Sequence, residues 1–341
     1  MRFGFFCDFD WERPLGAQVD EIVELAELAA EAGFESLWTG ENLPDGDSPL
    51  LPSPLIFLAS VARQVRLRLG TGIILAPLRE PYRLAYDSAV LDQLSDGRFT
   101  LGLGVGAPPI WNRFGIEKDD IAPTFDELLE ALPRLWAGEP GFEGEHVKIE
   151  GALWPRPAQE GGIPLWVAGR VKRATRRAAV HGEAFYASTP VRLDEIEVLG
   201  KDYRANLERL GKDPAAGRVA ANRIFGVAET EADVARFVEP YAMNVLRTYA
   251  GLGALRTEDG VTRTADEDLF RLFSEGIHLV GTPESVVETI RRYADAGVTD
   301  LNFRVLGGQT PVDVARRSLE LFRDEVVPRL GALAEPPVLA S

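Results

Sequence analysis

The chain has 341 residues, and 45% of them are hydrophobic, which is enough to fill the core of one large α/β domain or of two smaller ones. Its 37 basic and 53 acidic residues give a formal net charge of −16, which disfavours binding to nucleic acid or to a membrane and favours a small-molecule substrate. The single cysteine, Cys7, excludes an internal disulfide framework. Because there is no signal peptide and no apolar run near the ~18 residues of a membrane span, we expect a cytoplasmic protein.

Short apolar runs alternate with longer amphipathic segments along the whole chain, and each pair predicts one strand followed by one helix. The clearest unit covers residues 66–106, where a glycine-containing apolar run, an amphipathic segment and a second apolar run follow one another. The predicted strands are 2–6, 36–38, 68–73, 99–103, 165–167, 184–187, 219–227 and 300–305. The predicted helices are 17–32, 54–63, 82–95, 123–137, 172–181, 193–210, 231–249 and 283–296, with a last helix at 310–323 whose extension Pro328 ends.

Eight such units predict a closed (β/α)₈ barrel, since no glycine-rich dinucleotide fingerprint opens the first helix. Two insertions exceed ordinary loop length, 138–162 after strand four and 250–281 after strand seven, and we expect both to roof the site. The first contains a predicted extra strand at 146–149, and the second a predicted short helix at 266–273. Residues 1–330 are expected to form a single domain, and residues 331–341 a C-terminal tail.

In such a barrel, functional residues follow the carboxyl ends of the strands. Asp8 follows the first strand and Glu41 the second, so either carboxylate could act in acid/base chemistry. Each could instead hold a loop by pairing with Arg79 or Arg304, and the sequence leaves both readings open.

The segment 169–177, where the fifth strand enters its helix, starts with Gly169, Arg170, Val171, Lys172 and Arg173. Five of its residues are basic: Arg170, Lys172, Arg173, Arg176 and Arg177. A helix start presents free N–H groups and a positive dipole, so this segment could hold a phosphate. A solvated basic face is the alternative.

Glycines at 70, 72, 102, 104 and 106 crowd the ends of strands three and four. Glycine inside a strand often marks close approach by a ligand or by a neighbouring backbone, so a planar ligand could lie there, although tight barrel packing would also select small residues. Metal binding is not predicted, because His146, His181 and His278 lack ligand spacing. A serine nucleophile is not predicted either, since no Gly-x-Ser-x-Gly elbow occurs.

Several motifs together resemble the flavin-dependent oxidoreductases and monooxygenases similar to bacterial luciferase. The resemblance runs through AELAAEAGFESLW (26–38), LGTGIILAPLREP (69–81), AVLDQLSDGRFTLGLGVG (89–106), IPLWVAG (163–169), LVGTPE (279–284) and AGVTDL (296–301). It implies a barrel with a flavin at its carboxyl face. A non-prolyl cis peptide at Gly72-Ile73 would support the ring, and 169–175 would hold the phosphate.

Two positions depart from the luciferase pattern. Luciferases carry a histidine directly after the carboxylate of strand two, where this chain has Asn42, which cannot serve as a proton-transfer base. Their arginine after strand four is replaced by Val105, and Ala107 stands nearest to the glutamate of related deazaflavin-dependent enzymes. Neither catalytic set is intact.

The leading hypothesis is an FMN-dependent monooxygenase that takes reduced flavin from a separate NAD(P)H flavin reductase and acts on a small organic substrate. The hypothesis assigns catalysis to Glu41 and Asn42, and cofactor binding to Asp8, Thr71, Gly72, Ile73, Val105, Gly106, Gly169, Arg170, Val171, Lys172 and Arg173. One rival uses coenzyme F-420 for hydride transfer without oxygen, and another binds flavin without turnover. The family also implies a homo-oligomer, such as a dimer.

Overall fold

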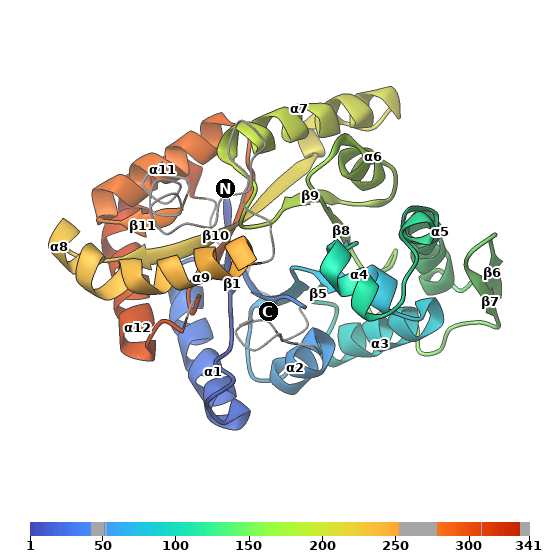
Figure 1. Cartoon of the computed structure of the whole chain (residues 1–341), viewed down its shortest axis with the longest axis horizontal. Coiled ribbons are helices and arrows are strands. Elements are labelled where there is room, and N and C mark those ends of the chain that lie inside the picture. Colours follow the sequence, from blue (N-terminus) through green and yellow to red (C-terminus); the bar gives the residue numbers. More distant parts are fainter. Residues whose placement is uncertain (42–50, 52, 252–277, 308, 335–341) are drawn as a thin grey trace.

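The computed structural model describes residues 1–41, 51, 53–251, 278–307 and 309–334. Eight parallel strand positions form a closed barrel, in which each strand pairs with the next and the last pairs with the first (Figure 1). The (β/α)₈ prediction is confirmed. Around the barrel the strands are β1 Arg2–Phe6, β2 Ser36–Thr39, β3 Arg68–Thr71 with its continuation β4 Ile74–Leu75, β5 Phe99–Gly104, β8 Leu165–Ala168, β9 Ala184–Ala187, β10 Arg218–Val227 and β12 Asp300–Arg304.

Helices surround the barrel and cover its outer face (Figure 1). They are α1 Leu15–Glu31, α2 Pro54–Val61, α3 Pro81–Leu94, α4 Pro108–Arg113, α5 Lys118–Trp136, α6 Lys172–His181, α7 Leu193–Arg209, α8 Glu231–Asp233, α9 Glu239–Gly251, α11 Pro283–Asp295, α12 Val312–Leu321 and α13 Val327–Leu330. None of the helices in the described part of the chain is long and apolar enough to cross a membrane. The short helix predicted at 266–273 lies outside the described residues.

Three predicted helix boundaries are wrong. Helix α5 begins five residues before Pro123, with Asp119 and Asp120 in its first turn, where their charges interact favourably with the helix dipole. The segment predicted as one helix over 231–249 is α8 and α9 joined by a π-helical turn at Val234–Val238. The last helix continues past Pro328, because a second π-helical turn precedes it and proline is tolerated in the first turn of α13.

Three elements were not predicted. Helix α4 follows β5 directly, and strand β11, Leu279–Gly281, extends the sheet by pairing with the last three residues of β10. The insertion after strand four forms an antiparallel hairpin of β6, Gly141–Glu143, and β7, Lys148–Glu150, of which the sequence indicated only the second strand, as 146–149.

The expectation that 138–162 roofs the site is wrong. The side chain of Glu127, on α5, accepts backbone hydrogen bonds from Glu145, His146 and Val147, so the hairpin packs on this helix. Farther along, the Gln159 side chain donates to the carbonyl of Phe99, the first residue of β5. The insertion returns from a helix to a strand, which keeps its end at the amino side of the barrel.

Charged and aromatic side chains close the amino end of the barrel. Arg218, at the start of β10, pairs with Asp300 at the start of β12 and with Glu183 just before β9. Its guanidinium lies 4.9 Å from the ring centre of Trp166, and that ring lies 4.5 Å from the ring centre of Trp38. The end opposite the strands' carboxyl termini is therefore filled, as in other barrels of this type.

A phenylalanine cluster packs between the barrel and its helices. Phe303, which is fully buried in β12, lies 5.4 Å from Phe3, 4.8 Å from Phe225 and 5.2 Å from Phe322 between ring centres. These contacts join β1, β10, β12 and the segment that follows α12, so they connect the two ends of the chain.

We expect Phe303→Ala to lower the free energy of unfolding by about 3–5 kcal/mol, because the substitution leaves a cavity in this cluster. Chemical denaturation measures the change. Phe114→Ala, at a ring that is 53% exposed, is the matched control and should cost far less. Equal losses in the two variants would contradict the assignment of Phe303 to the core.

Candidate functional site

The end of strand three carries a break that shapes the barrel mouth. A cis peptide joins Gly72 to Ile73, as predicted, and separates β3 from β4. The Ile73 side chain then turns over β5, because a Cβ atom on Gly104 would lie 2.4 Å from Ile73 Cδ1 and 3.5 Å from Ala168 Cβ. Ile73, Ala168 and Val105 are each partly exposed. Together they form an apolar face across strands β3, β5 and β8.

Thr71 holds this break in place. Its hydroxyl donates to the Gly102 carbonyl at 3.0 Å and accepts from the Gly102 N–H at 2.9 Å. A Cβ atom on Gly102 would lie 1.9 Å from the Thr71 carbonyl oxygen, so only glycine allows the two strands to approach this closely. Thr71 therefore positions the site through β5, and its side chain is fully buried.

Glu41, predicted as a catalytic group, is engaged with the segment after the break. One carboxylate oxygen accepts the Leu75 N–H at 2.7 Å, and the other pairs with Arg79. Burial raises the pKa of Glu41, while the Arg79 charge and these hydrogen bonds act in the opposite direction. The Glu41 carboxylate thus makes the contacts expected if it holds a loop, which was the alternative to acid/base chemistry. Asn42 lies outside the described residues.

Asp8 forms a second buried ion pair, with Arg304 at the end of β12. Its two oxygens accept from Nε at 3.0 Å and from an Nη at 2.7 Å, and both side chains are at most 2% exposed. Burial raises the pKa of Asp8, and the Arg304 charge offsets part of this effect. The pair connects the first and last strands of the barrel beneath its mouth.

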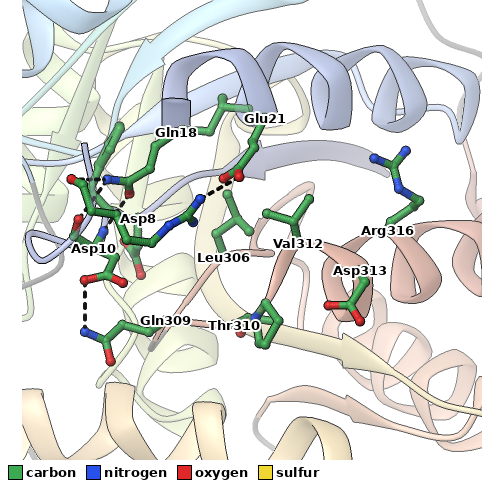
Figure 2. A pocket seen from close by; sticks show the side chains of 14 residues that line it. Asp8, Asp10, Gln18, Glu21, Leu306, Gln309, Thr310, Val312, Asp313 and Arg316 are labelled. Carbon is green, nitrogen blue, oxygen red and sulfur yellow. Dashed lines mark hydrogen bonds and ion pairs between the residues drawn. The ribbon is translucent and has the colours of Figure 1, made fainter. Parts of the chain in front are cut away.

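A cavity of about 620 Å³ lies beside Asp8, between α1 and the segment from β12 to α12 (Figure 2). Its polar walls are bonded to each other: Arg13 pairs with Glu21 at 2.5 Å, and Gln18 donates to the Asp10 carbonyl at 2.7 Å. Leu306 and Val312 line the opposite wall. Carboxylates outnumber arginines among its lining residues, so the cavity is a poor place for an anionic group.

The start of α6 has the opposite character. Its first turn contains no acidic residue, and no side chain caps it. Val171, Lys172 and Arg173 are exposed there, whereas Arg170 is partly buried and pairs with Glu195 at 2.9 Å. Gly169 brings the chain close to the helix, since a Cβ atom at this position would lie 2.3 Å from Ala174 Cβ. Helix dipole and charge both favour an anion here.

The sequence did not reveal a buried polar network inside the barrel. Tyr186 Oη accepts hydrogen bonds from Asn222 at 3.2 Å and from Asn302 at 3.4 Å, on neighbouring strands. Thr189 donates to Asn222 at 2.8 Å, and Tyr249 of α9 donates to Thr189 at 3.3 Å. The available signal was an asparagine within each of two otherwise largely apolar predicted strands.

These features fit a flat ring that carries a phosphate. The apolar face at Ile73, Val105 and Ala168 suits a ring, and the basic start of α6 suits a phosphate. The apolar face and the basic helix start both lie at the carboxyl ends of strands. The face lies at the ends of β4 and β5, and the helix start follows the end of β8. Gly106, with φ +71°, turns the chain after β5 and keeps this side of the mouth free of a larger side chain.

Comparison with known proteins shows the family of this chain. A family model described as luciferase-like monooxygenase matches residues 1–300. The chain belongs to this family. The predicted resemblance is confirmed, and so is the predicted class, an enzyme of luciferase-like type.

Luciferase-like relatives with different cofactors match along nearly the full length. The chain is 26% identical over 355 residues to the oxygenase component of the flavin-dependent trigonelline monooxygenase of Acinetobacter baylyi. The aligned region covers 96% of this chain and 95% of the relative. It is 27% identical over 350 residues to the F420-dependent glucose-6-phosphate dehydrogenase of Microbacterium testaceum, with 97% of each covered. Among solved structures, monooxygenase RslO1 from Streptomyces bottropensis has a TM-score of 0.80 and 26% identity, covering 96% of this chain and 99% of that one.

We expect Glu41→Ala to destabilise the fold by about 1–3 kcal/mol, because the buried Leu75 N–H loses its acceptor. Glu41→Gln keeps an acceptor there and should cost less. Chemical denaturation of both variants measures the difference. If Glu41→Ala lost activity with an unchanged free energy of unfolding, the carboxylate would be reacting rather than holding the turn.

His278 is buried just before β11, and burial together with the Arg223 and Arg304 charges lowers its pKa from 6.5 to about 3. Between these pH values the unfolded chain binds a proton that the folded protein does not, so the contribution to stability is lost as pH falls below 6.5. From pH 7 to pH 5 the loss amounts to about 2 kcal/mol.

We therefore expect His278→Gln to show a smaller fall in the free energy of unfolding between pH 7 and pH 5, by about 2 kcal/mol. Denaturant titrations at the two pH values provide the measurement. Exposed His146→Gln is the control and should behave as the wild type does. An identical pH dependence in His278→Gln and wild type would contradict the assignment.

Proposed function

We propose that the chain is a flavin-dependent monooxygenase that uses reduced FMN and oxidises a small organic substrate. The observation that carries the proposal is that two features meet at one barrel mouth. One is the apolar face at Ile73, and the other is the basic start of α6, whose first turn contains no acidic residue. This pairing matches the two ends of FMN. Membership in the luciferase-like family supports the same conclusion.

In this proposal each end of the cofactor has its own residues. The backbone of Gly169–Arg173 and the side chains of Lys172 and Arg173 bind the phosphate, and Arg170 orients the segment through Glu195. Thr71, Gly72 and Ile73 support the ring from β3, while Val105 and Gly106 border it from β5. Bound reduced flavin supplies the electrons that activate oxygen.

The remaining proposed site residues act on shape and access. Asp8 fixes Arg304, and Glu41 fixes the segment from Leu75 to Arg79, so both hold the walls of the mouth. Asn42, next to Glu41 in the chain, is proposed to orient the substrate by hydrogen bonding. The apolar face at Ile73 keeps water away from the side of the ring that rests on it.

Coenzyme F-420 is the second candidate cofactor, and the likeness to an F420-dependent glucose-6-phosphate dehydrogenase favours it. The apolar face and the basic helix start suit either ring system with its phosphate. With F-420 the reaction would be hydride transfer without oxygen, and the same residues would bind the phosphate.

A separate flavin reductase is the proposed partner. The relative from Acinetobacter baylyi is named as an oxygenase component, which supports a system of two proteins. In such a system an NAD(P)H-dependent reductase supplies reduced FMN to this chain. We also propose a homo-oligomer in the cytoplasm, with residues 1–330 as one domain.

Titration with FMN, reduced FMN and F-420 tests the cofactor, followed by oxygen consumption with the cofactor that binds. We expect Lys172→Ala combined with Arg173→Ala to weaken binding about tenfold or more, because charge-assisted contacts to the phosphate are lost. The matched control removes two exposed positive charges outside α6, Lys148→Ala on β7 with Arg209→Ala on α7.

The outcomes separate the proposals. Tight binding of FMN with oxygen consumption supports the monooxygenase, whereas binding of F-420 alone supports the second candidate. Binding of neither would overturn the cofactor proposal. Unchanged affinity in the Lys172/Arg173 variant, or an equal loss in the control variant, would overturn the phosphate assignment.

A further inference from the structure

The buried network in the barrel has a direction, set by its donors and acceptors. Arg304 donates to Tyr249 Oη at 2.7 Å, and Tyr249 donates to Thr189 at 3.3 Å. Thr189 donates to the Asn222 side-chain oxygen at 2.8 Å, and the Asn222 amide donates to Tyr186 Oη at 3.2 Å. Each bond polarises the next, and the chain starts at a fixed positive charge.

Tyr186 is the last member of this chain. Its oxygen accepts from two amides, Asn222 and Asn302, which occupies both lone pairs. Burial raises the pKa of Tyr186 to about 12, so the hydroxyl keeps its proton at neutral pH. No acceptor for that proton occurs among the residues that the structure describes.

Gly72 leaves the space that the Tyr186 hydroxyl occupies. A Cβ atom on Gly72 would lie 2.6 Å from Tyr186 Oη and 3.0 Å from Phe6 Cε2, so the hydroxyl takes up the space of a side chain at this position. Gly72 itself is partly exposed at the mouth. The hydroxyl therefore lies next to Gly72, in the segment against which the ring is proposed to bind.

We propose that Tyr186 donates a hydrogen bond to the cofactor ring bound against Gly72 and Ile73, and that Thr189 and Asn222 strengthen this donor. The inference rests on the proposed flavin site. It adds a binding residue on β9 that lies outside the strand-end segments assigned above, and it gives the buried network a role in holding the ring.

A purely structural role for the network predicts a different result. If Tyr186 only filled the barrel, removing its hydroxyl would change stability and leave a bound ring unaffected. If it donates to the ring, removal weakens binding and changes the visible absorption of the bound flavin, because the ring loses a hydrogen bond. Affinity and spectrum therefore distinguish the two roles without any measurement of turnover.

The experiment compares Tyr186→Phe with Tyr203→Phe. Tyr186 and Tyr203, on α7, are each 1% exposed. The Tyr203 hydroxyl donates to the Glu183 carbonyl at 3.1 Å, near the amino end of the barrel. Oxidised FMN is titrated into wild type and both variants, and the absorption of each complex is recorded. If wild type binds only F-420, that cofactor replaces FMN.

We expect Tyr186→Phe to weaken binding about 3- to 10-fold with a shifted spectrum, and Tyr203→Phe to change neither. Wild-type affinity and spectrum in Tyr186→Phe would overturn the inference while leaving the proposed function intact, provided that the Lys172/Arg173 variant still binds more weakly. Wild type that binds neither cofactor would overturn the proposed function instead.

Thr189→Val is a second variant for the case in which Tyr186→Phe does not fold. It removes the hydroxyl that donates to Asn222 and leaves Tyr186 and Gly72 unaltered. We expect a change of affinity in the same direction, about twofold, with a smaller spectral shift. An unchanged affinity and spectrum in this folded variant would overturn the proposed chain from Arg304 to Tyr186.

Discussion

The buried guanidinium of Arg304 is the constraint on which the mouth of the barrel depends. A charge removed from water must be paired and fully hydrogen-bonded, and here Asp8, Thr189 and Tyr249 provide the partners. These partners come from the segment after β1, from the segment after β9 and from α9. One side chain thus fixes the relative positions of the first strand, the last strand and two flanking segments at the end where ligands would enter.

Glycines set the remaining geometry of the mouth by allowing backbones and rings to touch. A side chain on Gly40 would meet the Gly72 carbonyl at 2.8 Å, and one on Gly102 would meet the Thr71 carbonyl. Strands β2, β3 and β5 therefore approach one another more closely than they could if these positions carried side chains. The apolar face at Ile73 exists because Gly104 leaves room for that side chain to cross β5.

The strands and the ion pairs could be predicted because their signals are local. The barrel strands lie within one residue of their predicted boundaries, except for β3, which ends two residues early at the break after Gly72. Arg79 and Arg304 were the two arginines named as partners for the strand-end carboxylates, and Glu41 and Asp8 each pair with one of them. The basic start of α6 was likewise readable from charge, since its helix begins at Lys172 as predicted.

The missed features depend on contacts between distant residues. Asn222 and Asn302 converge on Tyr186 only when β9, β10 and β12 lie side by side in a closed barrel, and no local pattern predicts this meeting. The hairpin at 138–162 was placed at the wrong end because length alone suggested a roof, whereas a segment that leads from a helix into a strand returns to the amino side. The π-helical turns have no sequence signal of comparable strength.

The charged closure formed by Arg218, Asp300 and Glu183 over Trp166 also limits the directions from which ligands can approach. These side chains fill the amino end of the described barrel, so no channel runs through it from that end to the mouth. A cofactor and a substrate would therefore arrive from the same side, at the carboxyl ends of the strands, and share one mouth. The packing of side chains far from the chemistry would in this way decide the direction from which both molecules come.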